Sequence, residues 1–247
     1  VDVSTGSIVS ATDALTGWAG TDVAGGVQER VAAHADSGPV PVHVMNDVDA
    51  HAAGEVWLGA AAGAPTSVLV AVGTGVGGGV VINGAAINGG HHVAGEVGHI
   101  PTPGAEGLRC ACGIDGHLEA IAAGPAIVRR YLALGGAKCG DARDVFERAR
   151  FGEALAQTVV RDAAVALGRA VAGIATILDP HVIVIGGGVP DAGSIWWEPM
   201  ERAFRGDVIP PLRDLGLVRA TLGSRAPIYG AAHGAWALLD ERPPVVP

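Results

Sequence analysis

Apolar residues recur along the chain at two spacings, and each spacing predicts one kind of element. Apolar positions three or four residues apart predict helices at residues 22–35, 47–59, 118–134, 153–178 and 227–239. The 153–178 segment has the clearest single apolar stripe. Short runs rich in Val and Ile predict buried strands at residues 40–45, 67–72, 79–82 and 181–185. Strands that alternate with helices indicate an α/β fold with a mixed or parallel sheet.

Turn and capping residues refine the ends of these elements. Asp22 precedes the first helix and can cap it, and Pro125 predicts a break or restart within the 118–134 helix. Residues 1–17 alternate apolar and polar residues around Gly6, which favours a hairpin or loop. The residues after Arg242 predict an extended, frayed tail.

Composition and charge narrow the class of protein. Hydrophobic residues make up 49% of the 247, enough for a substantial core, and 39 glycines with few aromatics predict a core of Ala, Val, Leu and Ile. A net charge of -9 without a cluster of Lys and Arg argues against a nucleic-acid or anionic-membrane surface on this chain. No segment resembles a signal peptide or a membrane span, and three cysteines make no disulfide framework. We expect a soluble, cytoplasmic protein.

Residues 91–120 concentrate side chains that carry chemistry. Two histidines and two cysteines in this segment are residue types that bind zinc: His99, Cys110, Cys112 and His117. Two carboxylates, Glu96 and Glu119, bracket the donors. One interpretation is a zinc site. The other is that the cysteines are small buried hydrophobes in a turn and the histidines are surface or hydrogen-bonded core residues.

Polar or glycine residues follow three of the predicted strands directly. Asn46-Asp47 lies where α/β folds place catalytic groups, although these residues can equally cap the next helix. Residues 73–78 match G-x-G-x-x-G, but a strand rather than a helix follows, so a phosphate-binding or merely flexible hairpin is expected. Residues 186–188 are three glycines, whose bare backbone lets a nucleotide approach. The only lysine, Lys138, lies in no Walker A motif.

These motifs occur together in an order that resembles the ROK family of sugar kinases and sugar-responsive repressors. The resemblance rests on GEVGH (95–99), CACGIDGHLE (110–119), VMND (44–47), VGTGVGGG (72–79) and VIGGG (184–188), and it covers nearly the whole chain. It implies the actin-like ATPase fold of the hexokinase superfamily, with two α/β domains around a cleft. It also implies an ATP-dependent hexose or N-acetylhexosamine kinase that uses Mg²⁺ and a structural zinc ion.

The resemblance assigns roles residue by residue. Asp47 is implied as the catalytic base. The residues implied to hold sugar hydroxyls, besides Asp47, are Asn46, Glu96, His99 and Glu119. The residues implied to contact the nucleotide are Thr74 and Gly75 at the phosphates and Gly186, Gly187 and Gly188 at the adenosine. The residues implied to bind zinc are His99, Cys110, Cys112 and His117.

The sequence departs from the family pattern at two places. His117 stands where the family usually has a third cysteine of the zinc site, and imidazole is also a good zinc donor. No Asp-x-Gly-Gly-Thr phosphate hairpin precedes Asp47. We therefore expect residues 1–45 to be the remnant of a small N-terminal α/β domain completed by the C-terminal helix at 226–247. Residues 46–225 would form the large α/β domain with the sugar, zinc and nucleotide motifs.

Two functions follow from the resemblance. The first is a sugar kinase, whose ligands would be a small-molecule sugar and a nucleotide and which would assemble as a homodimer or homotetramer. The second is the sugar-sensing domain of a ROK repressor, whose DNA-binding part would lie N-terminal to Val1. The presence of the Asn46-Asp47, glycine-hairpin and Gly186 motifs together favours the kinase.

Overall fold

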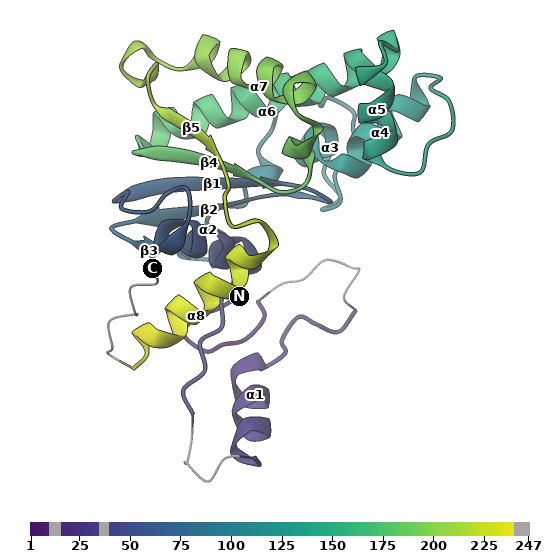
Figure 1. The fold of residues 1–247 in the computed structure, drawn as a ribbon. Helices are drawn as coiled ribbons and strands as arrows, with labels where there is room; N and C mark the ends of the chain where they lie inside the picture. The colour runs from purple at the N-terminus through teal and green to yellow at the C-terminus, as the bar shows by residue number, and fades with distance from the viewer. Residues whose placement is uncertain (10–15, 35–39, 240–247) are drawn as a thin grey trace. The chain divides into compact units, whose positions relative to one another are not determined.

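The computed structural model describes residues 1–9, 16–34 and 40–239, and the chain divides into two compact units (Figure 1). Unit 1 comprises Val1–Pro65, Gly79–Gly95 and Thr221–Pro247, and unit 2 comprises Thr66–Gly78 and Glu96–Ala220. Each unit is therefore assembled from segments that are distant in sequence. The residues of the predicted C-terminal tail lie outside the described ranges.

A five-stranded sheet runs in the order β3-β2-β1-β4-β5. Its strands are β1 (Thr66–Val72), β2 (Val76–Ile82), β3 (Ala85–Ala86), β4 (Val182–Gly186) and β5 (Gly216–Arg219). The strands β1, β4 and β5 are parallel, whereas β2 and β3 pair antiparallel. Strands β1 and β4 are buried over most of their length, as their continuous apolar runs predict. The predicted α/β class with a mixed sheet is confirmed.

The helices of unit 2 pack chiefly around one long helix, α6 (Ala154–Leu178). The others are α3 (Glu119–Ala122), α4 (Gly124–Ala133), α5 (Ala142–Arg150) and α7 (Ser194–Asp207). Figure 1 shows α6 and α7 on one side of β1, β4 and β5. A side chain at Gly168 would lie 2.2 Å from the Met200 carbonyl oxygen, so α6 and α7 approach at backbone distance. The predicted apolar stripe of α6 faces this core.

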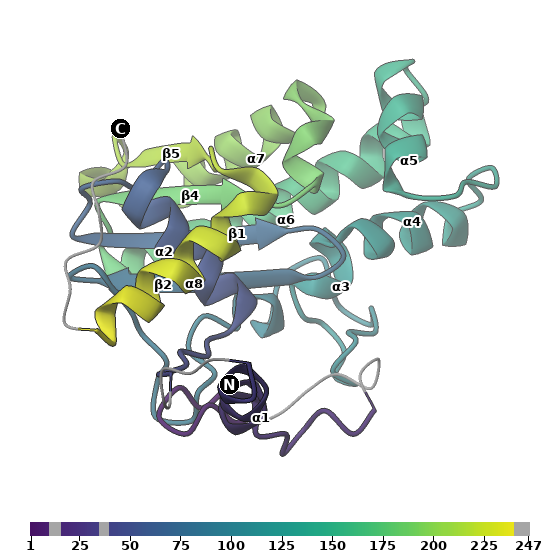
Figure 2. The ribbon, with the colours of Figure 1, turned by 60° about the horizontal axis from the view of Figure 1, so that its bottom comes forward.

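Unit 1 contains α1 (Val23–Ala32), α2 (Asp47–Leu58) and α8 (Ala226–Ala237). Helices α2 and α8 cross in close contact, as Figure 2 shows, because Gly54 and Gly230 leave room for backbone carbonyls of the facing helix. Trp57 packs edge-on against Tyr229 and Trp236 at the same junction. Asp22 caps α1, as predicted, by accepting a hydrogen bond from the Gly25 amide.

Some elements of the structure differ from those predicted from the sequence. The predicted strand at residues 40–45 is wrong, because this segment is irregular, its side chains are mostly half-buried, and no described strand pairs with it. Pro41 within the segment also lacks the N–H that a strand ladder needs. Helices α5 and α7 and strand β5 lie in segments for which no element was predicted. The expected break in 118–134 is confirmed, since α3 ends before Ala123 and Pro125 lies in the first turn of α4.

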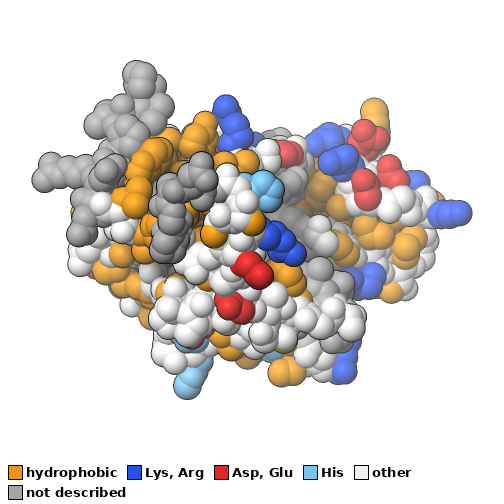
Figure 3. Space-filling view, turned by 90° about the horizontal axis from the view of Figure 1, so that it is seen from below, with side chains coloured by type: hydrophobic (Ala, Val, Ile, Leu, Met, Phe, Trp, Pro, Cys, Tyr) orange, Lys and Arg blue, Asp and Glu red, His pale blue; other side chains and the backbone are white. Residues whose placement is uncertain are grey.

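The surface carries apolar side chains among polar ones. On the face drawn in Figure 3, orange hydrophobic groups and blue Lys and Arg groups stand among white and red ones. Scattered exposed apolar residues are ordinary for a globular chain. In the described ranges, no helix combines the length and the apolar character needed to cross a membrane.

Candidate functional site

The segment from Glu96 to Glu119 is an irregular loop fixed by its own backbone. It begins with the short 3-10 helix η1 (Val97–His99) and ends where α3 begins. Pro101 pairs with His117 and Arg109 with Asp115 as isolated bridges, and the Leu118 amide donates to the Ile100 carbonyl at 3.0 Å. These contacts bring residues near the two ends of the loop together. The loop can therefore hold side chains in defined positions without a regular element.

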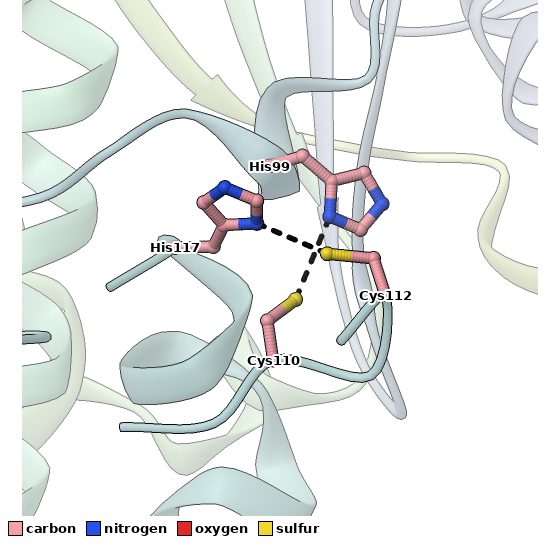
Figure 4. Close-up of side chains that lie close together, drawn as sticks. All are labelled: His99, Cys110, Cys112 and His117. Atoms are coloured by element: carbon pink, nitrogen blue, oxygen red, sulfur yellow. Dashed lines mark hydrogen bonds between the residues drawn. The ribbon is translucent and has the colours of Figure 1, made fainter. Parts of the chain in front are cut away.

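Four side chains of this loop converge, as Figure 4 shows. One ligand atom from each of His99, Cys110, Cys112 and His117 lies within 4.8 Å of the others. The Sγ of Cys110 lies 3.5 Å from Nδ1 of His99, and the Sγ of Cys112 lies 3.2 Å from Nδ1 of His117. Cys110 and His117 are buried, whereas Cys112 is exposed. The sequence predicted this set of four, and the structure brings all four together.

The geometry of the four side chains suits a tetrahedral zinc site. With zinc bonds of about 2.0–2.3 Å, ligand atoms of a tetrahedron stand roughly 3.3–3.8 Å apart, close to the observed S–N distances. Burial raises the pKa of Cys110 to about 11, with the neighbouring Glu119 carboxylate adding to the rise. Without a cation this cysteine is a thiol at neutral pH, and a bound zinc ion would displace its proton.

Glu119 connects this loop to the glycine hairpin between β1 and β2. Its Oε2 accepts a hydrogen bond from the Val76 amide at 3.0 Å, and its Oε1 lies 3.8 Å from the Sγ of Cys110. A side chain at Gly75 would lie 2.7 Å from Oε2, and one at Gly98 would lie 2.0 Å from the Val76 carbonyl oxygen. The GEVGH and Glu119 segments thus both rest on the start of β2.

Two glycine turns lie side by side in unit 2. Ala71 of β1 pairs with Gly186 of β4, so the turns that leave these parallel strands start at the same edge of the sheet. Gly187 has φ +87, and a side chain there would lie 2.2 Å from the Val72 carbonyl oxygen. Only glycine fits both the positive φ and this close approach. The carboxyl edge of parallel strands is where α/β folds bind ligands.

A third segment reaches this edge. The amide of Gly124, the first residue of α4, donates to the Gly73 carbonyl at 2.8 Å. A side chain at Gly124 would lie 3.2 Å from that oxygen and 3.9 Å from a methyl group of Val189. The first turn of α4 is therefore hydrogen-bonded to the Gly73 turn and lies near Val189, which follows the second glycine turn. Thr74 is exposed.

Asn46 and Asp47 lie in unit 1, at the start of α2. The Asn46 side chain accepts a hydrogen bond from the Val48 amide at 2.9 Å and is the N-cap of the helix. Asp47 is the first helical residue, and its carboxylate is exposed. Capping, one of the two roles considered for this pair, therefore belongs to Asn46. The Asp47 carboxylate is exposed and also accepts a hydrogen bond from the Val48 amide, at 3.0 Å.

The sequence did not indicate several residues that support these segments. Gly98 and Gly124 are needed for close backbone contact, and Glu55 is a buried carboxylate near the end of α2. Glu55 accepts hydrogen bonds from the amides of Ala60, Thr221 and Leu222. A single glutamate on an Ala-rich helix does not indicate that its hydrogen-bond donor, Thr221, lies 166 positions away.

The chain is similar to proteins of one known family. The family model described as the ROK family matches residues 2–237. The chain belongs to the ROK family. A glucokinase of Halalkalibacterium halodurans is 39% identical over 216 residues, which are 82% of this chain and 64% of that protein. This chain therefore spans less than two thirds of that relative.

Solved ROK structures have the same fold. The ROK hexokinase of Thermus thermophilus has a TM-score of 0.85 at 32% identity, covering 97% of this chain and 76% of that one. The ROK glucokinase of Streptomyces griseus, solved with glucose and AMPPNP, has a TM-score of 0.72 at 32% identity, covering 90% and 75%. A ROK transcriptional regulator has a TM-score of 0.80 at 28% identity, covering 97% and 61%. The predicted actin-like ATPase fold is confirmed.

Proposed function

We propose that this ROK chain acts in the ATP-dependent phosphorylation of the primary hydroxyl of a hexose or N-acetylhexosamine. The observation that carries the proposal is the connection made by Glu119. Its carboxylate accepts the Val76 amide beside the glycine hairpin, while its other oxygen faces the Cys110 thiol of the loop that carries Glu96 and His99. A sugar-binding loop and a phosphate-binding hairpin are thus coupled through one side chain. The similarity to a glucokinase crystallised with glucose and AMPPNP supports the same function.

His99 can serve zinc and sugar at the same time because its two ring nitrogens face different partners. Nδ1 lies 3.5 Å from the Cys110 sulfur and belongs to the zinc set. Nε2 lies 3.6 Å from a Glu96 carboxylate oxygen, away from the cysteines. We assign Nδ1 to the metal and Nε2, with Glu96 and Glu119, to sugar hydroxyls. The Asn46 side chain completes this set of sugar contacts in the proposal.

The proposed phosphoryl transfer uses two sets of groups. Thr74 and Gly75 would donate hydrogen bonds to the ATP phosphates, and Gly186, Gly187 and Gly188 would let the adenosine lie against bare backbone. Asp47 would accept the proton of the primary hydroxyl as its oxygen attacks the γ-phosphorus and ADP leaves. Mg²⁺ bound to the nucleotide supplies charge neutralisation at the phosphates, as is usual for this ion.

The zinc ion in this proposal is structural. The four donors His99, Cys110, Cys112 and His117 fill a tetrahedral site, which leaves no coordination position for a reacting water. Its role would be to hold η1 and the start of α3 in register, so that Glu96, His99 and Glu119 face one ligand. The Cys110 sulfur lies 3.5 Å from His99 Nδ1 and 3.8 Å from Glu119 Oε1, so it adjoins both the metal set and the sugar set.

The test is a phosphorylation assay on the intact protein. It would be incubated with ATP, Mg²⁺ and, separately, glucose, mannose and their N-acetyl derivatives, and sugar phosphate would be identified by phosphorus NMR. We expect ATP-dependent phosphorylation of the primary hydroxyl of at least one sugar. A protein that binds a sugar tightly yet forms no sugar phosphate would overturn the kinase proposal.

The second candidate is the sugar-sensing part of a ROK repressor. The specific observation in its favour is the TM-score of 0.80 to a ROK transcriptional regulator over 97% of this chain. A regulator would bind sugar through the same loop and transfer no phosphate. The same assay decides between the two, because sugar binding without turnover is the outcome expected of the regulator.

The proposed assembly has two further parts. We predict a small domain formed by residues 1–45 with 226–247 and a large domain formed by residues 46–225. We also predict a homodimeric or homotetrameric state. Size-exclusion chromatography with light scattering would measure the oligomeric state, and a monomer would contradict it.

A further inference from the structure

The zinc set of the proposed function, His99, Cys110, Cys112 and His117, contains two cysteines that lie in one tight turn. The Gly113 amide donates to the Cys110 carbonyl at 3.0 Å, which closes the turn around Cys112. The ligand atoms of the two cysteines lie within 4.8 Å of each other, and the Cys112 side chain is a hydrogen-bond neighbour of Cys110. Figure 4 shows both sulfur atoms turned into the same cluster. A disulfide needs Cα atoms about 4.4–6.8 Å apart, and two residues span roughly 7 Å only when fully extended, so the turn places this pair within reach.

The zinc set can form only one disulfide. Its other two members are imidazoles, which make no covalent bond with a sulfur atom in this way. The third cysteine of the chain, Cys139, lies before α5 and outside the set. Disulfide formation within the set therefore has a single product, the bond between Cys110 and Cys112.

The two cysteines differ in their access to solvent. Cys112 is exposed, whereas Cys110 is only 3% exposed. A bound zinc ion holds both sulfurs as thiolates, which is the form that reacts with oxidants. An exposed thiolate beside a second thiolate is the arrangement of a peroxide-sensitive cysteine with its resolving partner. An oxidant from solvent therefore meets Cys112 first and Cys110 second.

We infer that Cys110 and Cys112 form a redox switch, in which hydrogen peroxide links them as a disulfide and the loop then loses its zinc ion. The Cys112 thiolate attacks one peroxide oxygen, which gives a sulfenic acid and a hydroxide ion. The Cys110 thiolate then attacks the Cys112 sulfur, forms the S–S bond and expels the second hydroxide. Two electrons pass from the sulfurs to the peroxide, and two protons from solvent convert the hydroxides to water. His99 and His117 remain as two of four donors, too few to hold a structural zinc ion.

The switch would act on the sugar loop locally and reversibly. The Sγ of Cys110 lies 3.5 Å from His99 Nδ1 and 3.8 Å from Glu119 Oε1, and a disulfide draws this sulfur away from both. The backbone hydrogen bonds that close the loop involve neither sulfur, so reduction can restore the site. The inference rests on the proposed function for the role of this loop in sugar binding. Oxidised protein should therefore bind sugar more weakly than reduced protein.

The test treats the intact, zinc-loaded protein with hydrogen peroxide and follows two readouts that need no turnover. Released zinc is measured with a chromogenic chelator, and the disulfide by mass spectrometry of the tryptic peptide 110–129, which carries both cysteines. We expect one zinc ion to be released for each disulfide formed. After the peroxide is removed, sugar affinity measured by calorimetry should be weaker by about tenfold or more. Dithiothreitol with added zinc should restore it.

Two variants separate the disulfide from general oxidation. Cys112→His keeps four zinc donors but leaves one thiol in the set, so peroxide should release zinc more slowly than from the wild type by about tenfold or more. The matched control is Cys139→Ser, which removes the cysteine outside the set and should release zinc at the wild-type rate. Circular dichroism and zinc content under reducing conditions check that each variant is folded and loaded. Where a variant does not load, the ratio of disulfide to released zinc in the wild type decides the question.

Three results would overturn the inference: reduced wild-type protein that binds no zinc, zinc that is retained under peroxide, or zinc that is released without a disulfide between Cys110 and Cys112. The sugar phosphorylation assay on the reduced protein is read separately. Turnover by a protein whose zinc resists peroxide removes only the switch. Zinc release together with the disulfide, in a protein that phosphorylates no sugar, removes only the kinase.

Discussion

Glu55 offers a sharp test of how unit 1 is held together. Its side chain is 1% exposed and accepts hydrogen bonds from four donors: the amides of Ala60 at 2.7 Å, Thr221 at 3.0 Å and Leu222 at 2.9 Å, and the Thr221 hydroxyl at 3.2 Å. These bonds join the end of α2 to the segment that leads into α8. In Glu55→Gln, an amide NH₂ must replace one carboxylate oxygen and face an N–H donor.

The expected loss in the free energy of unfolding is about 1–3 kcal/mol. Full values for four charge-assisted bonds would sum to more, but Thr221 is exposed and Ala60 and Leu222 are half-buried, so water replaces part of what is lost. Urea denaturation followed by circular dichroism measures the change as a lower midpoint at unchanged slope. The control is Glu198→Gln, which breaks an exposed ion pair with Arg202 on α7 and should cost under about 0.5 kcal/mol. Equal midpoints for the two variants would refute the reasoning.

Three further perturbations test other parts of the molecule. Cys112→Ser should abolish the binding of one zinc ion per chain, measured by elemental analysis. It should also weaken sugar affinity by about tenfold or more, because the zinc ion would no longer hold the loop in place. Gly187→Ala should weaken ATP binding by about tenfold or more, measured by calorimetry, because the new methyl group would lie 2.2 Å from the Val72 carbonyl oxygen at a positive φ. Burial lowers the pKa of His233 below its ordinary 6.5, so its contribution to stability is complete above pH 6.5 and is lost as the pH falls through the lowered pKa. His233→Gln should therefore flatten the decline in stability between pH 6.5 and 5.

Each of these variants has a matched control. Cys139→Ser removes a cysteine outside the cluster and should leave zinc content unchanged. Gly173→Ala adds a methyl group on α6 with no described heavy atom within 4 Å beyond its chain neighbours and its own helix backbone, so ATP affinity should hold. His181→Gln alters an exposed histidine and should keep the pH slope of the wild type. Retained zinc, retained ATP affinity or a retained slope in the test variant would count against the respective prediction.

The sequence predicted elements whose signal is local. The apolar stripe of α6 and the Val and Ile runs of β1 and β4 recur over many residues, and all three elements are present within one residue of the expected bounds. The segment 40–45 has the same local pattern as a buried strand, yet it finds no partner among the described residues. Pairing is a property of the neighbouring chain, which a local pattern does not report.

The candidate site was predictable where one short segment supplies the chemistry. His99, Cys110, Cys112 and His117 are spaced closely enough for their shared identity as metal donors to be visible. The contacts of Glu119 with Val76 and of Gly124 with Gly73 join segments about 40 to 50 positions apart, and no local pattern predicts them. Residues such as Glu55 are recognisable only from the hydrogen bonds that the fold creates.

The central claim is that Asp47 is the catalytic base, and one variant tests it directly. In Asp47→Asn, the intact protein should still bind its sugar within about threefold of the wild-type affinity, because the amide keeps the size of the side chain and one oxygen that can accept the Val48 amide. The rate of ATP-dependent sugar phosphorylation should fall at least 100-fold, since general-base catalysis contributes about 10²–10⁴. Phosphorylation by Asp47→Asn at the wild-type rate would contradict the assignment of Asp47 as the base.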